Sequence, residues 1–144
     1  MNKIILKVFS LGALRLVMGF IFLWAFLDKT FGLGFATAGT SAWINGGSPT
    51  AGFLAHATKG PFAPFFQSLS GVGIVDWLFM LGLLVVGVTL LLNKYVKWGS
   101  VVGLIMMLLM YLALLWPENN PLIDEHIVYA IIFGYFSITS TNKR

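Results

Sequence analysis

The segment DEHIVYAIIF (residues 124–133) combines two acids, a histidine and two aromatic residues at spacings that suit proton transfer. His126, Tyr129 and Phe133 recur at intervals of three and four residues, so on a helix they share one face. Histidine titrates near neutral pH, and a neighbouring acid such as Asp124 can tune it or relay its proton. We predict Asp124 and His126 as catalytic residues and Tyr129 and Phe133 as walls of a binding site. The alternative is that His126 is only a capping or solvated residue at the start of a helix.

Charged residues around the first apolar run could bind an anion or take part in the same chemistry. Asp28 and Lys29 stand where this run ends, and Arg15 lies inside it. An arginine inside an apolar segment marks function unless its long side chain reaches the membrane surface, and both interpretations stay open for Arg15. We predict Asp28 as catalytic and Lys29 and Arg15 as substrate-binding residues.

Two further residues complete the predicted site. His56 is assigned to substrate binding and Trp77 to the aromatic wall that holds a cofactor. His56 and His126 could in principle hold haem or copper together, because both are expected on one side of the protein. We predict no metal site and no haem.

The composition indicates which solvent surrounds these residues. The chain has 144 residues, of which 58% are hydrophobic and only 10% are charged, whereas soluble domains carry about 25% charged residues. A soluble helical bundle of this size could not bury so much apolar helix surface. The absence of Cys excludes disulfides, thiolate chemistry and iron–sulfur clusters. The net charge is +4, but the sequence contains no basic patch interleaved with aromatic residues, so we predict no nucleic-acid partner.

Four apolar stretches predict an all-α, polytopic membrane protein, a single domain over residues 1–144 built as a four-transmembrane-helix bundle. The predicted spans cover about residues 11–28, 75–92, 98–116 and 121–140, each close to the length that crosses a bilayer. The last stretch has a shorter apolar run. Asn120 as N-cap and Pro121 as first helical residue would extend it to spanning length.

The charges predict the orientation of the bundle. Four spans place both termini on one side, which then holds six basic residues: Lys3, Lys7, Lys94, Lys97, Lys143 and Arg144. The positive-inside rule makes this side cytoplasmic, in a multi-pass protein of the cell membrane. All five acids and both histidines then fall on the outer side. They form either an ordinary interfacial rim or a functional pocket at the mouth of the bundle.

The connection over residues 30–74 is too long for a simple loop. Ser48 can cap a helix that starts at Pro49 and ends at Gly60, and a second short helix is predicted over residues 62–69. Both segments carry an apolar face. We expect two short helices at the outer membrane surface, either as a lid over a site for a lipid-soluble molecule or as a structural cap.

Gly99 and Gly103 form a GxxxG pattern in the third predicted span. Small residues at this spacing let transmembrane helices approach closely. Packing inside the bundle is favoured, and a seam between copies in a homo-oligomer is the alternative.

The chain resembles the DoxX/DoxD family of small bacterial and archaeal membrane proteins. The resemblance is carried by LRLVMGFIFLWAFLDKTFGLG, AWINGGSPTAGFL, DWLFMLGLLVVGVTLLL, GLIMMLLMYLA and ENNPLIDEHIVYA, which keep the family's motif order over nearly the whole chain. Arg15 and Lys29 stand where the family's opening helix has an Arg near its start and a Lys at its end.

The resemblance implies a four-helix membrane bundle and two possible functions. Some members are the membrane subunit of a thiosulfate:quinone oxidoreductase, and others associate with membrane complexes in redox stress. It therefore implies a subunit of a quinone-linked oxidoreductase, with quinone as electron acceptor near the outer end of the bundle and thiosulfate or another sulfur compound as donor. The alternative is a non-catalytic accessory or assembly subunit. Either function implies membrane lipid and another membrane or periplasmic subunit as partners.

Overall fold

The computed structural model describes residues 3–118 and 120–140, with side chains from residue 10 onward. Within these residues every regular element is helical, and the one β-type contact is an isolated bridge between Lys59 and Leu114. Four long helices make up most of the protein: α1 (Lys3–Phe31), α4 (Gly73–Leu92), α5 (Val96–Ala113) and α6 (Glu125–Thr139). Four short elements occupy the connection between α1 and α4: η1 (Gly39–Ser41), η2 (Trp43–Asn45), α2 (Ala51–His56) and α3 (Ala63–Ser68).

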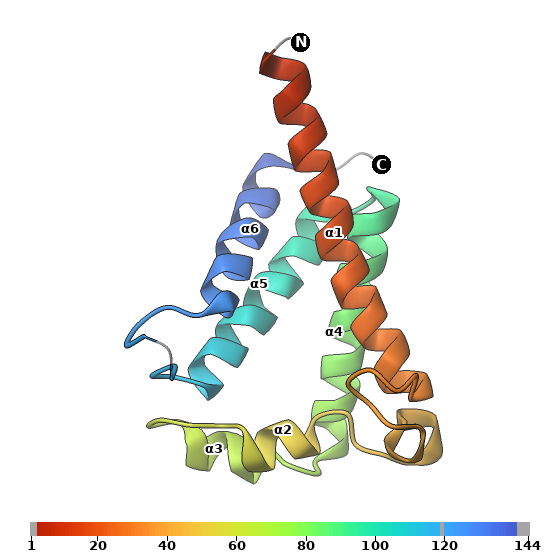
Figure 1. Cartoon of the computed structure of the whole chain (residues 1–144), viewed down its shortest axis with the longest axis vertical. Helices are drawn as coiled ribbons and strands as arrows, with labels where there is room; N and C mark the ends of the chain where they lie inside the picture. The colour runs from red at the N-terminus through yellow and green to blue at the C-terminus, as the bar shows by residue number, and fades with distance from the viewer. Residues whose placement is uncertain (1–2, 119, 141–144) are drawn as a thin grey trace.

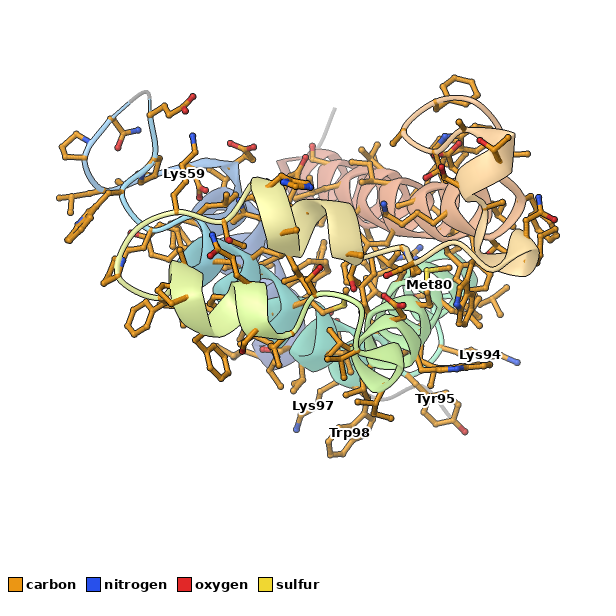
Figure 2. The ribbon with its side chains drawn as sticks, turned by 90° about the horizontal axis from the view of Figure 1, so that it is seen from below. Lys59, Met80, Lys94, Tyr95, Lys97 and Trp98 are labelled. Carbon is orange, nitrogen blue, oxygen red and sulfur yellow. The ribbon has the colours of Figure 1, made fainter. Side chains whose placement is uncertain are left out.

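The four long helices pack one after another in chain order around a shared apolar core (Figure 1). Helix α1 packs along α4, α4 along α5, and α5 along α6, whereas α1 and α6 are joined mainly through side chains. The first turns of α1 and the last turn of α6 lie at one end of the protein, here called the terminal end. The short helices α2 and α3 lie across the opposite end, here called the lid end (Figure 2).

In the part of the chain that the structure describes, three helices are long and apolar enough to cross a membrane: the Ser10–Phe31 portion of α1, all of α4 and all of α5. Their outward faces carry exposed leucine, isoleucine, valine and aromatic side chains, as expected for helices surrounded by lipid. Helix α6 is apolar but has only 15 residues. At 1.5 Å per residue it is about 22 Å long, which is shorter than a hydrocarbon core of about 30 Å.

The predicted start of the last helix was wrong. The helix begins at Glu125 with Asp124 as its N-cap, and not at Pro121 with Asn120 as the cap. Asn120 instead forms a turn of its own, because its side-chain oxygen accepts the backbone N–H groups of Leu122 and Ile123 at 2.9 and 2.6 Å.

The predicted end of the third span also needs correction, since α5 ends at Ala113 and not at Trp116. The Ala113 carbonyl accepts the Lys59 amide at 2.8 Å, so the chain leaves the helix to pair with the lid end. Pro117 adds to this termination, because the residue before a proline disfavours the helical conformation. Trp116 has a φ of 67°. At the other end of the chain, α1 is longer than the predicted 11–28 and extends to Phe31.

The two short helices form close to their predicted positions. The Ser48 hydroxyl accepts the Ala51 amide at 3.0 Å, in the manner of a cap, and Pro49 follows it. Regular α-helix begins only at Ala51 and ends at His56, before Gly60. Helix α3 lies within the predicted 62–69 segment.

Glycines set the distances between the long helices. A Cβ atom on Gly87 would lie 2.7 Å from the backbone nitrogen of Leu23, so α1 and α4 touch backbone to backbone there. A Cβ on Gly103 would lie 2.6 Å from the Phe133 ring. Gly99 faces Thr89 in the same way. The GxxxG pattern of α5 therefore packs against α4 and α6 inside this chain, as favoured from the sequence.

Candidate functional site: two cavities near the lid end

A cavity of about 590 Å³ lies between α4 and α5 and beneath the two short helices. This larger cavity has walls from α1, α2, α3, α4, α5 and the residues 49–50 segment. Almost all of its walls are aliphatic or aromatic side chains, including Phe53, Phe66 and Phe79. Its volume falls in the range of cavities that enclose small-molecule ligands. The short helices therefore cover a space that suits an apolar molecule.

A buried carboxylate fixes the cover of the larger cavity. Asp76, in the first turn of α4, is 7% exposed. Its Oδ1 accepts hydrogen bonds from the Ser48 hydroxyl at 2.8 Å, the Thr50 hydroxyl at 2.5 Å and the Thr50 amide at 3.2 Å. These contacts hold the start of α2 to the start of α4. Asp76 was not among the residues assigned to the site from sequence, and a lone acid at a helix start gives no signal of this role.

A second contact holds the cover at its far side. Lys59, in the loop between α2 and α3, pairs with Glu118 beyond α5 (Figure 2 labels Lys59). This hydrogen bond and the charge of Lys59 lower the pKa of Glu118 from its usual value. Both side chains are exposed, so water screens the pair and its contribution to stability is small.

Lys29 is the charged side chain in the wall of the larger cavity. Its Nζ lies 6.0 Å from the centre of the Phe79 ring, at the outer limit of a cation–π contact. The sequence predicted Lys29 as an anion-binding residue at the outer water boundary. The structure places Lys29 in the wall of a mostly apolar cavity.

A smaller cavity of about 170 Å³ lies at the centre of the bundle. Its walls include Ile21 and Phe22 of α1, and His126 and Tyr129 of α6. The two cavities have three lining residues in common: Phe79, Met106 and Met110. They are therefore neighbours, and these three flexible or aromatic side chains form the partition.

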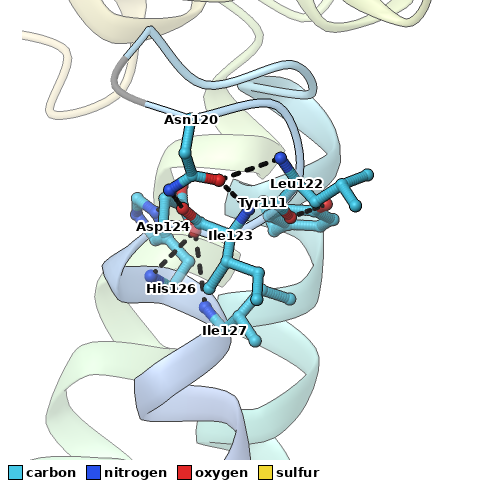
Figure 3. Close-up of polar contacts among 7 residues, drawn as sticks. All are labelled: Tyr111, Asn120, Leu122, Ile123, Asp124, His126 and Ile127. Atoms are coloured by element: carbon cyan, nitrogen blue, oxygen red, sulfur yellow. Dashed lines mark hydrogen bonds and ion pairs between the residues drawn. The ribbon is translucent and has the colours of Figure 1, made fainter.

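Asp124 and His126 form a pair at the start of α6 (Figure 3). The Asp124 Oδ1 accepts the amides of His126 and Ile127 at 3.0 and 3.4 Å, which caps the helix. Its Oδ2 lies 2.9 Å from Nδ1 of His126. Because a carboxylate oxygen only accepts, the hydrogen of this contact belongs to Nδ1. The pair fixes the imidazole ring and leaves Nε2 available to a ligand.

The two partners are also shielded from solvent. The side chains of His126 and Asp124 are 12% and 9% exposed. Within the described residues, neither Nε2 of His126 nor the Tyr129 hydroxyl makes a hydrogen bond. The smaller cavity is therefore lined by two residues that each keep a polar group with unused hydrogen-bonding capacity. This confirms that His126 and Tyr129 share a face, as the sequence predicted.

The segment before α6 supports this pair. The Tyr111 hydroxyl of α5 donates to the Leu122 carbonyl at 2.6 Å (Figure 3). Leu122 also belongs to the turn that Asn120 closes, whose backbone runs directly into Asp124. The Tyr111 hydrogen bond therefore fastens α5 to the chain that leads into the Asp124 cap.

The remaining predicted site residues lie outside both cavity walls. The buried Asp28 accepts the amides of Phe35 and Ala36 at 3.2 and 2.9 Å, so its carboxylate closes the loop after α1. Phe133 is fully buried and packs edge-to-face on Phe22 with ring centres 5.2 Å apart. Phe133 therefore packs against a wall residue of the smaller cavity without lining the cavity itself.

Trp77, His56 and Arg15 are separate from one another and from the cavities. Trp77 packs on Trp43 of η2, with ring centres 4.6 Å apart, on the surface. His56 is exposed at the end of α2. The Arg15 guanidinium donates to the Leu90 carbonyl in the last turn of α4. A positive charge is favourable at that helix end, so a structural partner accounts for this intramembrane arginine.

Asp124, Glu125 and His126 bring three potential metal ligands within 4.8 Å. The oxygens of Asp124 already cap α6 and accept from His126. The group is therefore better explained as a helix start than as a metal site.

Comparison with known proteins yields no relative: no family model, no curated protein and no solved structure matches this chain.

Proposed function

We propose that this protein is a membrane-embedded subunit of a quinone-linked oxidoreductase, with the quinone ring held in the smaller cavity. The observation that carries the proposal is that His126 and Tyr129, each with an unused hydrogen-bonding group, line a ring-sized apolar space. An apolar cavity of about 150 Å³ holds a benzene ring. The smaller cavity, at about 170 Å³, has room for one six-membered ring.

The surrounding helices suit a quinone with a long apolar tail. Ile21 of α1 lines the smaller cavity and is also 38% exposed. Helices α1 and α6 are not packed along their lengths. A tail can therefore pass between α1 and α6 into lipid while the ring stays beside His126. Apolar walls with a few placed polar groups are the usual make-up of such sites.

The reaction has a defined requirement for protons and electrons. Quinone takes up two electrons and two protons to become quinol. In its protonated form His126 can give a proton to one quinone oxygen, and Asp124 stabilises the charged imidazole and holds its orientation. Tyr129 can donate a hydrogen bond to a quinone oxygen, and the second proton comes from water. The electrons must come from a donor bound by a partner subunit, and the resemblance to the DoxX/DoxD family points to a reduced sulfur compound such as thiosulfate.

The proposed topology has four spans with both termini on the cytoplasmic side. The terminal end and the exposed Lys94 and Lys97 beside the α4–α5 turn support it. The predicted contributions of Lys143 and Arg144, and of the Lys3 and Lys7 side chains, lie outside the described residues. In this topology α6 crosses together with the apolar residues 122–123, and the bilayer thins locally around it.

The proposal is tested by titrating decylubiquinone, a short-tailed quinone, into the purified protein in nanodiscs of neutral lipid. We expect saturable binding with one site per chain, measured by calorimetry. His126→Phe keeps a ring of similar size but removes the polar nitrogens. It should weaken binding by about tenfold, the value of one hydrogen bond of about 1.4 kcal/mol.

The matched control is His56→Phe, which changes the exposed histidine of α2 and should leave the affinity unchanged. Non-saturable binding in the wild type, or equal affinity of the wild type and His126→Phe, would remove the quinone site from this cavity.

The second candidate is an accessory subunit without turnover. The observation that favours it is the composition: with no Cys, the chain has no thiolate to ligate an iron–sulfur cluster or relay electrons. The two functions differ in one readout. Quinone reduction by the intact complex should fall in His126→Phe if the chain binds the acceptor, and should stay unchanged if the chain only assembles the complex.

A further inference from the structure

Lys29 has a positive charge that forms no ion pair within the described part of the chain, and only the adjacent carboxylate of Asp28 attracts it electrostatically. Its ammonium group carries three N–H donors, and its one ring contact, with Phe79, lies at 6.0 Å. Among residues 10–118 and 120–140, no carboxylate lies within ion-pair distance of Lys29. The neighbouring Asp28 uses both of its oxygens to accept the amides of Phe35 and Ala36.

The surroundings make this charge costly to leave unpaired. The rest of the larger cavity is almost entirely aliphatic and aromatic. An isolated charge beside such a surface is unfavourable, and an opposite charge nearby offsets much of that cost. A quinone ring in the smaller cavity would not provide one, because quinones are neutral.

The shape of the larger cavity indicates where the rest of a ligand would lie. Leu78 of α4 and Ile105 and Leu109 of α5 line it and are also 64%, 53% and 50% exposed. On spanning helices these exposed faces meet lipid. The cavity is therefore open sideways toward the membrane, whereas α2 and α3 cover it at the lid end (Figure 2).

We propose that the larger cavity binds a single-chain amphiphile with an acidic headgroup, such as a long-chain carboxylate. The headgroup pairs with Lys29, and the chain passes between α4 and α5 toward Leu78 and Ile105. The volume of about 590 Å³ suits a ligand of this size. A two-chain phospholipid is too large to be enclosed, although its phosphate could offer Lys29 the same chemistry from the rim. This site is separate from the proposed quinone site.

The test compares oleate with oleyl alcohol, which have the same chain and differ in headgroup charge. Each is titrated by calorimetry into the full chain in a neutral detergent, at a pH of about 8 so that oleate is ionised. We expect the wild type to bind oleate more tightly by about tenfold or more, as for a hydrogen bond between charged groups.

Three variants separate the role of Lys29 from folding. Lys29→Met keeps the length of the side chain and should remove the preference for oleate while leaving the affinity for oleyl alcohol unchanged. Lys29→Arg keeps the charge and should retain the preference. Lys94→Met, at the opposite end of the protein, is the matched control and should behave as the wild type.

A competition experiment identifies the natural source of the acidic group. Displacement of oleate by phosphatidylglycerol, but not by phosphatidylcholine, would assign the site to an anionic lipid and support the acidic-headgroup proposal. Displacement by neither would support a free fatty acid. Equal affinity for oleate and oleyl alcohol in the wild type, or an undiminished preference in Lys29→Met, would overturn the proposal.

The same preparation separates this site from the proposed quinone site. Decylubiquinone should still bind when oleate is saturating, because the two ligands occupy different cavities. Loss of the oleate preference with quinone binding intact would sink only the acidic-ligand proposal. The reverse result would sink only the quinone proposal.

Discussion

The two cavities share a partition of Phe79, Met106 and Met110 but offer different chemistry. The larger one, between α4 and α5, is apolar apart from Lys29 in its wall. The smaller one, among α1, α4, α5 and α6, is lined by a histidine and a tyrosine. Both lie toward the lid end, where the sequence places all the acids. The difference shows that charges gathered at one level of a bundle are divided among separate sites by side-chain packing.

The carboxylates at this end make the same point. Asp28 and Asp76 accept backbone and hydroxyl hydrogens from the connection between α1 and α4, and so hold the loop and the cover in place. Asp124 also caps a helix, but its second oxygen reaches His126. The third carboxylate therefore differs from the other two in holding a titratable ring, His126, that lines a cavity.

The largest effect should come from a change that damages both cavities together. Phe133 is fully buried and contacts Phe22 and Gly103 behind the smaller cavity. Phe133→Ala should lower the free energy of unfolding by about 3 kcal/mol, because it leaves a large void. It should also weaken the binding of both oleate and decylubiquinone. Unfolding in mixed detergent micelles measures the first effect and calorimetry the second.

The control for Phe133→Ala lies on the same helix. Ile138 is 85% exposed, so Ile138→Ala should leave stability and both affinities close to those of the wild type. Selective loss of one ligand in Phe133→Ala would show that the cavities are mechanically independent.

A change at Asp76 should affect ligand binding in the larger cavity without affecting the smaller one. Asp76→Ala leaves the buried amide and hydroxyl of Thr50 without their acceptor, which should cost about 2 kcal/mol. Because these bonds hold the start of α2, the cover should loosen. Oleate binding should weaken, while decylubiquinone binding should not change. Faster hydrogen exchange over residues 48–56 measures the loosening.

Asp76→Asn is the matched control, because an amide oxygen can still accept these hydrogen bonds. It should lose less stability than Asp76→Ala. Unchanged exchange in Asp76→Ala would mean that the cover is held by apolar contacts alone.

A change at Asp124 should affect the smaller cavity and spare the larger one, with a smaller effect on stability than the change at Asp76. Asp124→Ala removes the N-cap of α6 and should cost about 1 kcal/mol. It also frees the His126 ring, so decylubiquinone binding should weaken while oleate binding stays unchanged. Asp124→Asn retains a capping side chain and should recover the stability but not the charge beside His126. Equal quinone affinity in all three proteins would contradict a role for the pair.

The smallest effect concerns pH and the exposed pair of Lys59 and Glu118. Lys59 lowers the pKa of Glu118 in the folded protein. The stabilisation is therefore present above the usual pKa of a glutamate and is lost as the pH falls through the lowered value. Acidification from pH 7 to about 3 should slightly lower the hydrogen-exchange protection of the loop between α2 and α3, measured relative to the intrinsic exchange rate at each pH. Glu118→Gln should show the lower protection already at pH 7 and little further change with acid.

Several parts of the fold could be predicted from local sequence signals. Unbroken apolar runs identified α1, α4 and α5, because a helix that is apolar on all sides has no stable place in water. Ser48, Pro49 and Gly60 located α2, since capping and backbone geometry act within a few residues. The start of α6 could not be fixed in this way. Asn120 and Asp124 are both competent caps, and only the positions that the rest of the chain allows select between them.

In the candidate site, too, some relations between residues follow from local sequence and others depend on tertiary packing. The sequence by itself determined that His126 and Tyr129 share a face, because helical spacing alone sets that relation. Only the tertiary structure decided that Arg15 meets a helix end, that Asp76 holds the cover and that Lys29 faces an apolar cavity. These relations join residues dozens of positions apart in the chain. They depend on how far apart the helices pack, which glycines such as Gly87 set through backbone contact and which no local pattern encodes.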